Sequence, residues 1–329
     1  MISPETVLKR STFLKAIAAA AVSVTALASH AAGWPDKPIT LVVPLAPGGS
    51  TDTTARMMAE KLSGVLGQRV VVDNRTGAGG NIGAAYVAKQ ARDGHTFLLH
   101  TSTMATNVTL YKSMGFDPQK DLIPVSQVAL IPNVLMVNDA VPAKNLEEFV
   151  QLVKQKKAVI NYGSAGNGTS QHLSGALFDS MAGGGMVHVP YRGGAPANAD
   201  LIAGQIQAVF SPLVEVLPYI ETGKLRALGI TTKNRSPRLP NVPAIGEALP
   251  GFEVVLWNGI FAPADTPAEV VDTMNAAVRK VLADPAVRKT LADQGSTPVG
   301  NSPAEFKQVL ASEIDKWGKL VKLSGARVD

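Results

Sequence analysis

The chain has 329 residues, of which 46% are hydrophobic and 17% are charged. This composition is too apolar and too weakly charged for a disordered protein, and the length predicts about two domains. Lys and Arg number 31 against 26 Asp and Glu, but the basic residues are scattered, which argues against nucleic-acid binding. Cysteine is absent, which excludes disulfides, thiolate zinc sites and cysteine nucleophiles.

The N-terminus has the pattern of a cleavable export signal. Lys9, Arg10 and Lys15 precede the apolar segment 16–28, and a cluster of small residues follows. The basic stretch lacks the second arginine of a twin-arginine motif, which favours the general secretory (Sec) route. We therefore predict a signal peptide over residues 1–31 and a mature protein in the periplasm.

From residue 33 the hydrophobic pattern alternates between β-branched runs and helical periodicity. The first part predicts strands at 39–43, 69–73 and 97–100, with helices at 55–66 and 82–91 and another after 103. This order is typical of a parallel sheet with helices on both faces.

The pattern restarts near residue 134 and predicts a second α/β unit. Its predicted strands are 134–137, 159–162, 187–191, 207–210 and 225–230, and its predicted helices are 146–156, 169–181, 196–203 and 213–222. The last third carries three helix starts in a row, with capping signals at Thr266, Asp284 and Ser302. Three helices without an intervening strand cannot form a sheet, so we expect them to pack on the first unit.

Such packing makes the first domain discontinuous. We predict one lobe from residues 33–134 plus 256–329 and a second lobe from 135–255. The fold class is then α/β, with two lobes whose central sheets are mainly parallel and are joined by two hinge crossings. Ligands of open α/β sheets bind at the carboxyl ends of strands, so we expect the site in the cleft between the lobes.

Two loops rich in glycine and hydroxyl side chains join a strand to a helix, one in each predicted lobe: residues 44–52 and 162–170. Glycine lets the backbone approach a ligand closely, and the first turn of a helix offers free N–H groups at the positive end of its dipole. Ser50, Thr51 or Asp52 can also cap the first helix. Two such loops that face each other could hold a dicarboxylate without an arginine. The segments 101–103 and 192–194 end other strands and could line the same crevice. Alternatively, each loop is only a well-capped connection.

The remaining motifs do not predict an enzyme. The glycine loop at 77–83 has Ile82 where a dinucleotide-binding fingerprint needs glycine. Ser164 is not in a nucleophile elbow, because Tyr162 stands where that motif has glycine. The histidines share no metal-ligand spacing. We expect no catalytic residue, no cofactor and no metal.

Several motifs, taken together and in order, resemble the tripartite tricarboxylate transporter receptor family, also called the Bug family. They lie at residues 34–39, 44–52, 74–83, 161–164, 172–175, 189–194 and 257–259. The resemblance implies a type II periplasmic-binding-protein fold without catalysis. It also implies a small carboxylate ligand (a di- or tricarboxylate, an acidic amino acid or an aromatic acid) and delivery to the large and small integral-membrane permease subunits of a tripartite transporter. We expect a monomer.

By resemblance, individual residues of the loops acquire ligand-binding roles. The first loop contributes Gly48, Gly49, Ser50, Thr51 and Asp52, and the second contributes Ser164, Ala165, Gly166, Thr169 and Ser170. From their positions in the first loop and at the ends of the other two strands, we add Ala46, Pro47, Ser102 and Gly193. Leu45 replaces an aromatic residue common in the family. Two other functions stay open: a periplasmic sensor that presents a bound carboxylate to a membrane signalling kinase, and a secreted hydrolase or isomerase of carboxylates.

Overall fold

The computed structural model describes residues 33–156 and 159–328. The predicted signal peptide over 1–31 therefore lies outside the described residues. Residues from Lys37 onward form one unit, and the description below concerns that unit. None of the helices in the described ranges is long and apolar enough to span a membrane.

The first part of the chain folds as the alternating pattern predicts. Its strands are β1 (Ile39–Val43), β2 (Val70–Asn74) and β3 (Thr96–Thr101); its helices are α2 (Ser50–Leu66), α3 (Asn81–Ala88) and α4 (Thr103–Leu110). Strand β1 pairs in parallel with both β2 and β3. Helix α2 ends at Gly67, whose backbone is left-handed with φ 70°, a conformation that glycine adopts without steric cost.

The second part repeats the pattern. Its strands are β5 (Ile160–Ser164), β6 (Met186–Pro190), β7 (Ala208–Pro212) and β8 (Arg226–Ile230); its helices are α5 (Leu146–Gln155), α6 (Ser170–Ala182), α7 (Gly194–Ile202) and α8 (Leu213–Glu221). Strand β5 pairs in parallel with β6 and β7. These elements agree with the predicted ones to within a few residues at each end.

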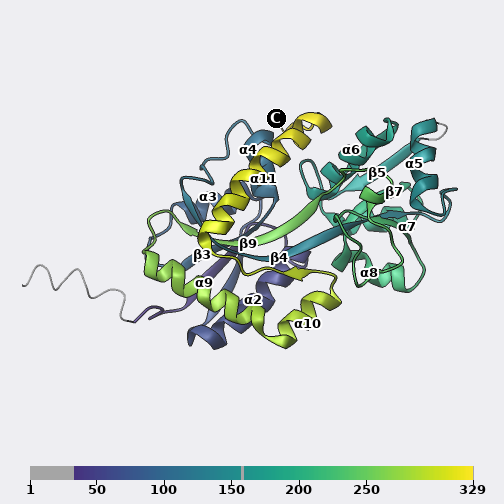
Figure 1. Cartoon of the computed structure of the whole chain (residues 1–329). Coiled ribbons are helices and arrows are strands. Elements are labelled where there is room, and N and C mark those ends of the chain that lie inside the picture. Colours follow the sequence, from purple (N-terminus) through teal and green to yellow (C-terminus); the bar gives the residue numbers. More distant parts are fainter. Residues whose placement is uncertain (1–32, 157–158, 329) are drawn as a thin grey trace, which may run out of the picture. The chain divides into compact units, whose positions relative to one another are not determined.

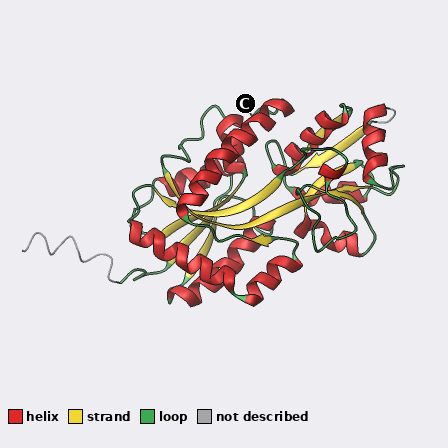
Figure 2. Cartoon of the chain, in the orientation of Figure 1, coloured by secondary structure: helices red, strands yellow, loops and turns green. Residues whose placement is uncertain are grey.

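Two long strands join the parallel groups into one mixed sheet, with the order β2-β1-β3-β9-β4-β7-β5-β6. Strand β4 (Leu122–Val137) pairs antiparallel with β9 (Val255–Pro263) over its first part and with β7 and β8 over its last residues. Figure 1 shows both strands running between the two groups, and Figure 2 shows helices on both sides of the strands.

The sequence prediction missed the first part of β4, because a strand was expected only at 134–137, where β4 ends. The sequence of β4 contains Pro124 and Pro132, and proline inside a run argues against a central strand. The structure accommodates Pro124 at a shift in register between β4 and β9, after which the pairing resumes at Ser126.

The C-terminal part adds α9 (Ala268–Ala283), α10 (Pro285–Asp293), the short strand β10 (Thr297–Pro298) and α11 (Pro303–Ser324). Helix α9 packs on α2, and α11 packs on α4 and β4, as expected for the first unit. Two details differ from the prediction. Strand β10 pairs with β4 between α10 and α11, and α11 also packs against α6 of the second unit.

Two tryptophans anchor α11 to the sheet. Trp257 and Trp317 are almost fully buried, and both indole N–H groups donate to Glu313 Oε2, at 3.0 and 2.5 Å. Phe306 packs edge-on against Trp257, with ring centroids 5.5 Å apart. The shared carboxylate satisfies two buried donors, so the helix buries its apolar face without leaving polar groups unpaired.

The helix caps test the sequence signals directly. Asn145 accepts from the Glu148 N–H at α5, Asp284 accepts from Ala286 at α10, and Ser302 forms a full capping box with Glu305 at α11. The expected cap at Thr266 was wrong. Helix α9 begins one residue later, with Pro267 as the N-cap, and the Thr266 hydroxyl donates to the Pro263 carbonyl at 2.8 Å.

The Ser302→Ala substitution should lower the free energy of unfolding by about 1 kcal/mol, because it leaves the Glu305 N–H in the first turn of α11 without its acceptor. Urea unfolding of both proteins measures this difference. The matched control is Ser312→Ala on the same helix, whose hydroxyl only donates back to the Val309 carbonyl. An equal loss in the two variants would contradict the capping interpretation.

Candidate functional site

The loop between β1 and α2 leads into a helix whose N-cap residue has no side chain. The N-cap is Gly49, and none of Ser50, Thr51 and Asp52 takes that position, so the expectation of a cap from one of them was wrong. Gly48 needs to be glycine because its φ is +82°, whereas Gly49 is extended and a Cβ there would meet only the Ala46 carbonyl oxygen at 3.7 Å. Ser50 itself is the first helical residue, which places its side chain beyond the capping position.

Asp52 braces this loop. Its Oδ2 accepts from the Gly48 N–H and from Arg56 Nε, both at 2.9 Å, and its Oδ1 accepts from Asn74 Nδ2 at 2.9 Å. Burial raises the pKa of the Asp52 carboxyl, but hydrogen bonds from Arg56, Gly48 and Asn74 outweigh it, so the net pKa lies below its ordinary value. The carboxylate is therefore used within the protein and holds the loop on its helix.

Unsatisfied polar groups lie beside the start of α2. The Thr51 hydroxyl donates to Asn258 Oδ1 at 3.4 Å, and Asn258 pairs with Thr101 at the end of β3. Asn258 Nδ2 and Ser102 Oγ are both buried, and neither has a hydrogen-bond partner in the described part of the chain. Buried polar atoms in native proteins nearly always have partners, so a bound molecule would complete this site. Sequence reasoning did not select Asn258, although it lies in the quoted motif at 257–259.

The second loop is held together by its own hydroxyls. Ser164 is fully buried, and its Oγ accepts from the Gly166 N–H at 3.1 Å and lies 2.6 Å from His188 Nε2. Thr169 caps α6: it accepts from the His172 N–H and donates to the Gly166 carbonyl at 2.8 Å. These two hydroxyls shape the loop, and their direct contact with a ligand stays a prediction.

The two loops approach each other at Glu215, which sequence reasoning missed. Hydrogen bonds from the backbone N–H and hydroxyl of Ser50 reach the Glu215 carboxylate from the first loop. A Cβ on Gly194 would overlap Glu215 Oε2 and would lie 3.0 Å from Gln171 Nε2. Gln171 in turn accepts from the Ala165 N–H of the second loop. Burial raises the pKa of the Glu215 carboxyl, and the bonds from Ser50 offset only part of that rise.

The structure brings several of the predicted residues together at this place. Another predicted residue, Gly193, is next in sequence to Gly194, which lies beside Glu215. Ser50 bonds Glu215, the Ala165 N–H donates to Gln171, and Glu215 and Gln171 both lie beside Gly194. Thr51 lies against Asn258. Gly193, with φ +119°, directly precedes Gly194 as the N-cap of α7. A sequence signal for Glu215 does exist, because it is the one charged residue in the otherwise apolar stretch 213–218.

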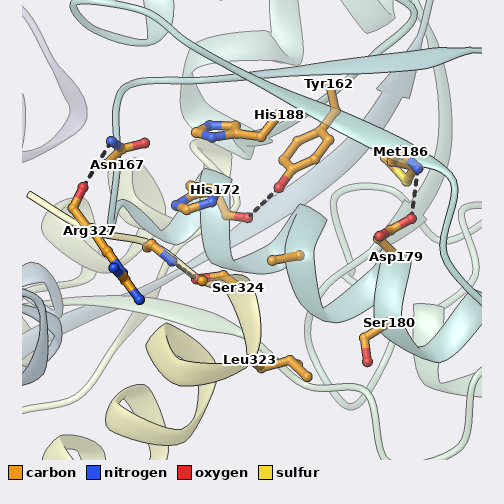
Figure 3. Close-up of a pocket in the computed structure, with 13 residues that line it drawn as sticks. Tyr162, Asn167, His172, Asp179, Ser180, Met186, His188, Leu323, Ser324 and Arg327 are labelled. Atoms are coloured by element: carbon orange, nitrogen blue, oxygen red, sulfur yellow. Dashed lines mark hydrogen bonds between the residues drawn. The ribbon is translucent and has the colours of Figure 1, made fainter.

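A separate pocket of about 560 Å³ lies beside α6 and the end of α11 (Figure 3). Its wall includes Tyr162 and the stacked imidazoles of His172 and His188, whose ring centroids are 3.8 Å apart. The pKa of His172 is lowered to about 3 by burial and the neighbouring His188, and burial lowers the pKa of His188 to about 4. Both rings are therefore neutral at neutral pH. None of the predicted ligand-binding residues lines this pocket.

The described residues contain no group of three or more His, Asp or Glu side chains placed to hold a metal ion. The site at the start of α2 offers instead backbone N–H groups, an amide and hydroxyls. Such groups suit the oxygen atoms of an anion.

The buried histidines predict a loss of stability in acid. His172 titrates near 6.5 when unfolded and near 3 in the fold, so the unfolded chain binds its proton first as the pH falls. Neutral His172 stabilises the fold fully above about pH 6.5, and this stabilisation is lost as the pH drops towards 3. The free energy of unfolding falls with a slope of up to ~1.4 kcal/mol per pH unit.

His172→Asn keeps an acceptor where His172 Nδ1 accepts from the Gly168 N–H, but it cannot titrate. Between about pH 6 and pH 4.5, the free energy of unfolding in urea should therefore fall less steeply for this variant than for the wild type. The difference in slope should correspond to the uptake of about one proton on unfolding. Parallel pH dependences in the two proteins would show that His172 is not buried neutral.

Comparison with known proteins places these observations in a family. Residues 54–326 match the family described as "Tripartite tricarboxylate transporter family receptor" (TctC). The solved structure of the periplasmic binding protein BugD is similar, at 33% identity and a TM-score of 0.81, over 89% of this chain and 99% of BugD.

Two further similar structures hold carboxylates. A protein of R. palustris solved with adipate is 38% identical, with a TM-score of 0.84 over 90% of this chain and 100% of its own. MatC of Rhodopseudomonas palustris, solved with bound malate, is 34% identical, with a TM-score of 0.79 over 88% of this chain and 100% of its own. The predicted family and the α/β periplasmic-binding-protein fold are confirmed. The chain therefore belongs to the tripartite tricarboxylate transporter receptor family, as a periplasmic solute-binding protein and not an enzyme.

Proposed function

We propose that the protein captures a small carboxylate in the periplasm and delivers it to a tripartite tricarboxylate-type membrane transporter. The observation that carries this proposal is the start of α2, whose N-cap Gly49 has no side chain, beside the unpartnered amide of Asn258 and hydroxyl of Ser102. These groups can donate hydrogen bonds to carboxylate oxygens, and the helix dipole favours a negative charge there. Support also comes from similar proteins that were solved with adipate and with malate.

In this proposal the two loops bind opposite ends of the ligand. One carboxylate lies on the first loop, and the loop at the start of α6 contacts the other end. The ligand-binding residues remain those predicted from the sequence, and we add Asn258 to them. The predicted residues are Ala46, Pro47, Gly48, Gly49, Ser50, Thr51, Asp52, Ser102, Ser164, Ala165, Gly166, Thr169, Ser170 and Gly193. Recognition by backbone groups leaves the length of the ligand open.

Capture requires a change between open and closed forms. We propose that residues 33–134 plus 256–329 form one lobe and residues 135–255 the other, with β4 and β9 as the hinge. A ligand that contacts both loops binds the closed form more tightly and shifts the population towards it. The closed surface is then what the large and small permease subunits recognise, with a monomeric receptor exported by the signal at residues 1–31.

A ligand panel tests this function. The mature protein, freed of bound ligand by unfolding and refolding, should melt at a higher temperature with at least one di- or tricarboxylate, acidic amino acid or aromatic acid. The corresponding neutral amides and sugars should leave the melting temperature unchanged. A rise for a neutral compound alone, with every acid silent, would refute a carboxylate receptor.

The Gly49→Val variant locates the site. Its Cβ has room, so the fold should persist, while the branched side chain blocks approach to the N–H groups of α2. Loss of such charge-assisted bonds should weaken binding about 10- to 100-fold, as measured by titration calorimetry. Gly64→Val on the same helix, where nothing lies within 4 Å of an added Cβ, is the matched control and should bind normally. Equal affinity of both folded variants would place the ligand elsewhere.

A further inference from the structure

A single carboxylate lies where several helices begin. Ser50 is the first residue of α2 and Gly194 the first of α7, while Gln171 lies in the first turn of α6 and Glu215 in the first turn of α8. Ser50 bonds the Glu215 carboxylate, and Gly194 lies beside both Glu215 Oε2 and Gln171 Nε2. Each helix start carries a partial positive charge, which explains why a half-buried acid is tolerated there.

No full positive charge balances Glu215 from within the described residues. The ion pairs found there involve other acids, and Glu215 is not among them. Its bonds come from the neutral hydroxyl and backbone N–H of Ser50. A half-buried carboxylate with neutral partners attracts a cation more strongly than a solvated one, because less water screens the interaction.

The position of Glu215 also divides the site into two chemical parts. The donors of Ser50 are already engaged by Glu215, whereas Asn258 Nδ2 and Ser102 Oγ beside Thr51 are unpartnered in the described chain. A ligand carboxylate therefore fits on the Asn258 side. The part of the ligand nearest Glu215 then meets a negative charge rather than a hydrogen-bond donor.

We propose that Glu215 is a specificity-determining residue that selects ligands carrying an ammonium group beside a carboxylate, such as acidic amino acids, over dicarboxylates that lack the amino group. This inference rests on the proposed function and narrows its ligand class. The ammonium group donates to the Glu215 carboxylate and balances its charge. A second carboxylate in the same place is repelled.

Matched acids that differ only in the α-amino group test the inference: aspartate with succinate, glutamate with glutarate, and 2-aminoadipate with adipate. Titration calorimetry at pH 7 gives the ratio of affinities within each pair. In the wild-type protein the amino member should bind at least tenfold more tightly in the pair of the right length. Glu215→Gln keeps the shape and removes the charge, so this ratio should fall at least tenfold, with equal or tighter binding of the plain dicarboxylate.

Two further variants test whether the change in the affinity ratio comes from the charge of Glu215. Glu221→Gln lies on the same helix but forms an exposed pair with Arg238, and it should leave the ratio unchanged. Glu215→Asp keeps the charge and should retain the preference for the amino member, which preserves the test if the glutamine variant does not fold.

The outcomes separate the two proposals. A wild-type preference for the plain dicarboxylate in every pair, or an unchanged ratio in Glu215→Gln, overturns the inference about Glu215 while leaving a carboxylate receptor intact. Silence of wild-type protein towards all six acids, together with binding of a neutral compound, overturns the proposed function itself.

Discussion

The antiparallel pairing of β4 with β9 is the constraint on which the site depends. The two strands are far apart in the sequence, and their pairing joins two parallel groups of strands into one sheet. On its other edge β9 pairs with β3, which places Asn258 opposite Thr101 at the end of β3 and beside the first turn of α2. Without β9 between β3 and β4, the unpartnered amide would not lie beside the start of α2.

The chemistry of the site follows from how its charges are held. Asp52 has a charged partner and several hydrogen bonds, so its carboxylate stays ionised and fixes the backbone of the first loop. Glu215 has neutral partners, and its pKa lies above the ordinary value. In the proposed function the two acids act differently: Asp52 shapes the donors for a ligand anion, and Glu215 supplies the negative charge for a ligand cation.

Local signals predicted most elements, because a strand such as Ile39–Val43 or a cap such as Ser302 needs only its own neighbours in sequence. The first part of β4 was missed because Pro124 and Pro132 argue against a strand, and only its pairing with β9 compensates for them.

The site was predictable only in part, for the same reason. Glycine-rich loops are visible in the sequence, and the family resemblance was confirmed over residues 54–326. The contacts of Ser50 with Glu215 and of Thr51 with Asn258 join residues more than 150 positions apart. No local pattern specifies such contacts, and a single glutamate in an apolar helix does not reveal which loop it meets.

The most direct test of a carboxylate receptor is a crystal structure of the mature protein with the acid that raises its melting temperature most. We expect carboxylate oxygens within hydrogen-bond distance of the backbone N–H groups at the start of α2 and of Asn258 Nδ2. A ligand seated instead in the pocket beside His172 and His188, with the start of α2 bearing only water, would contradict it.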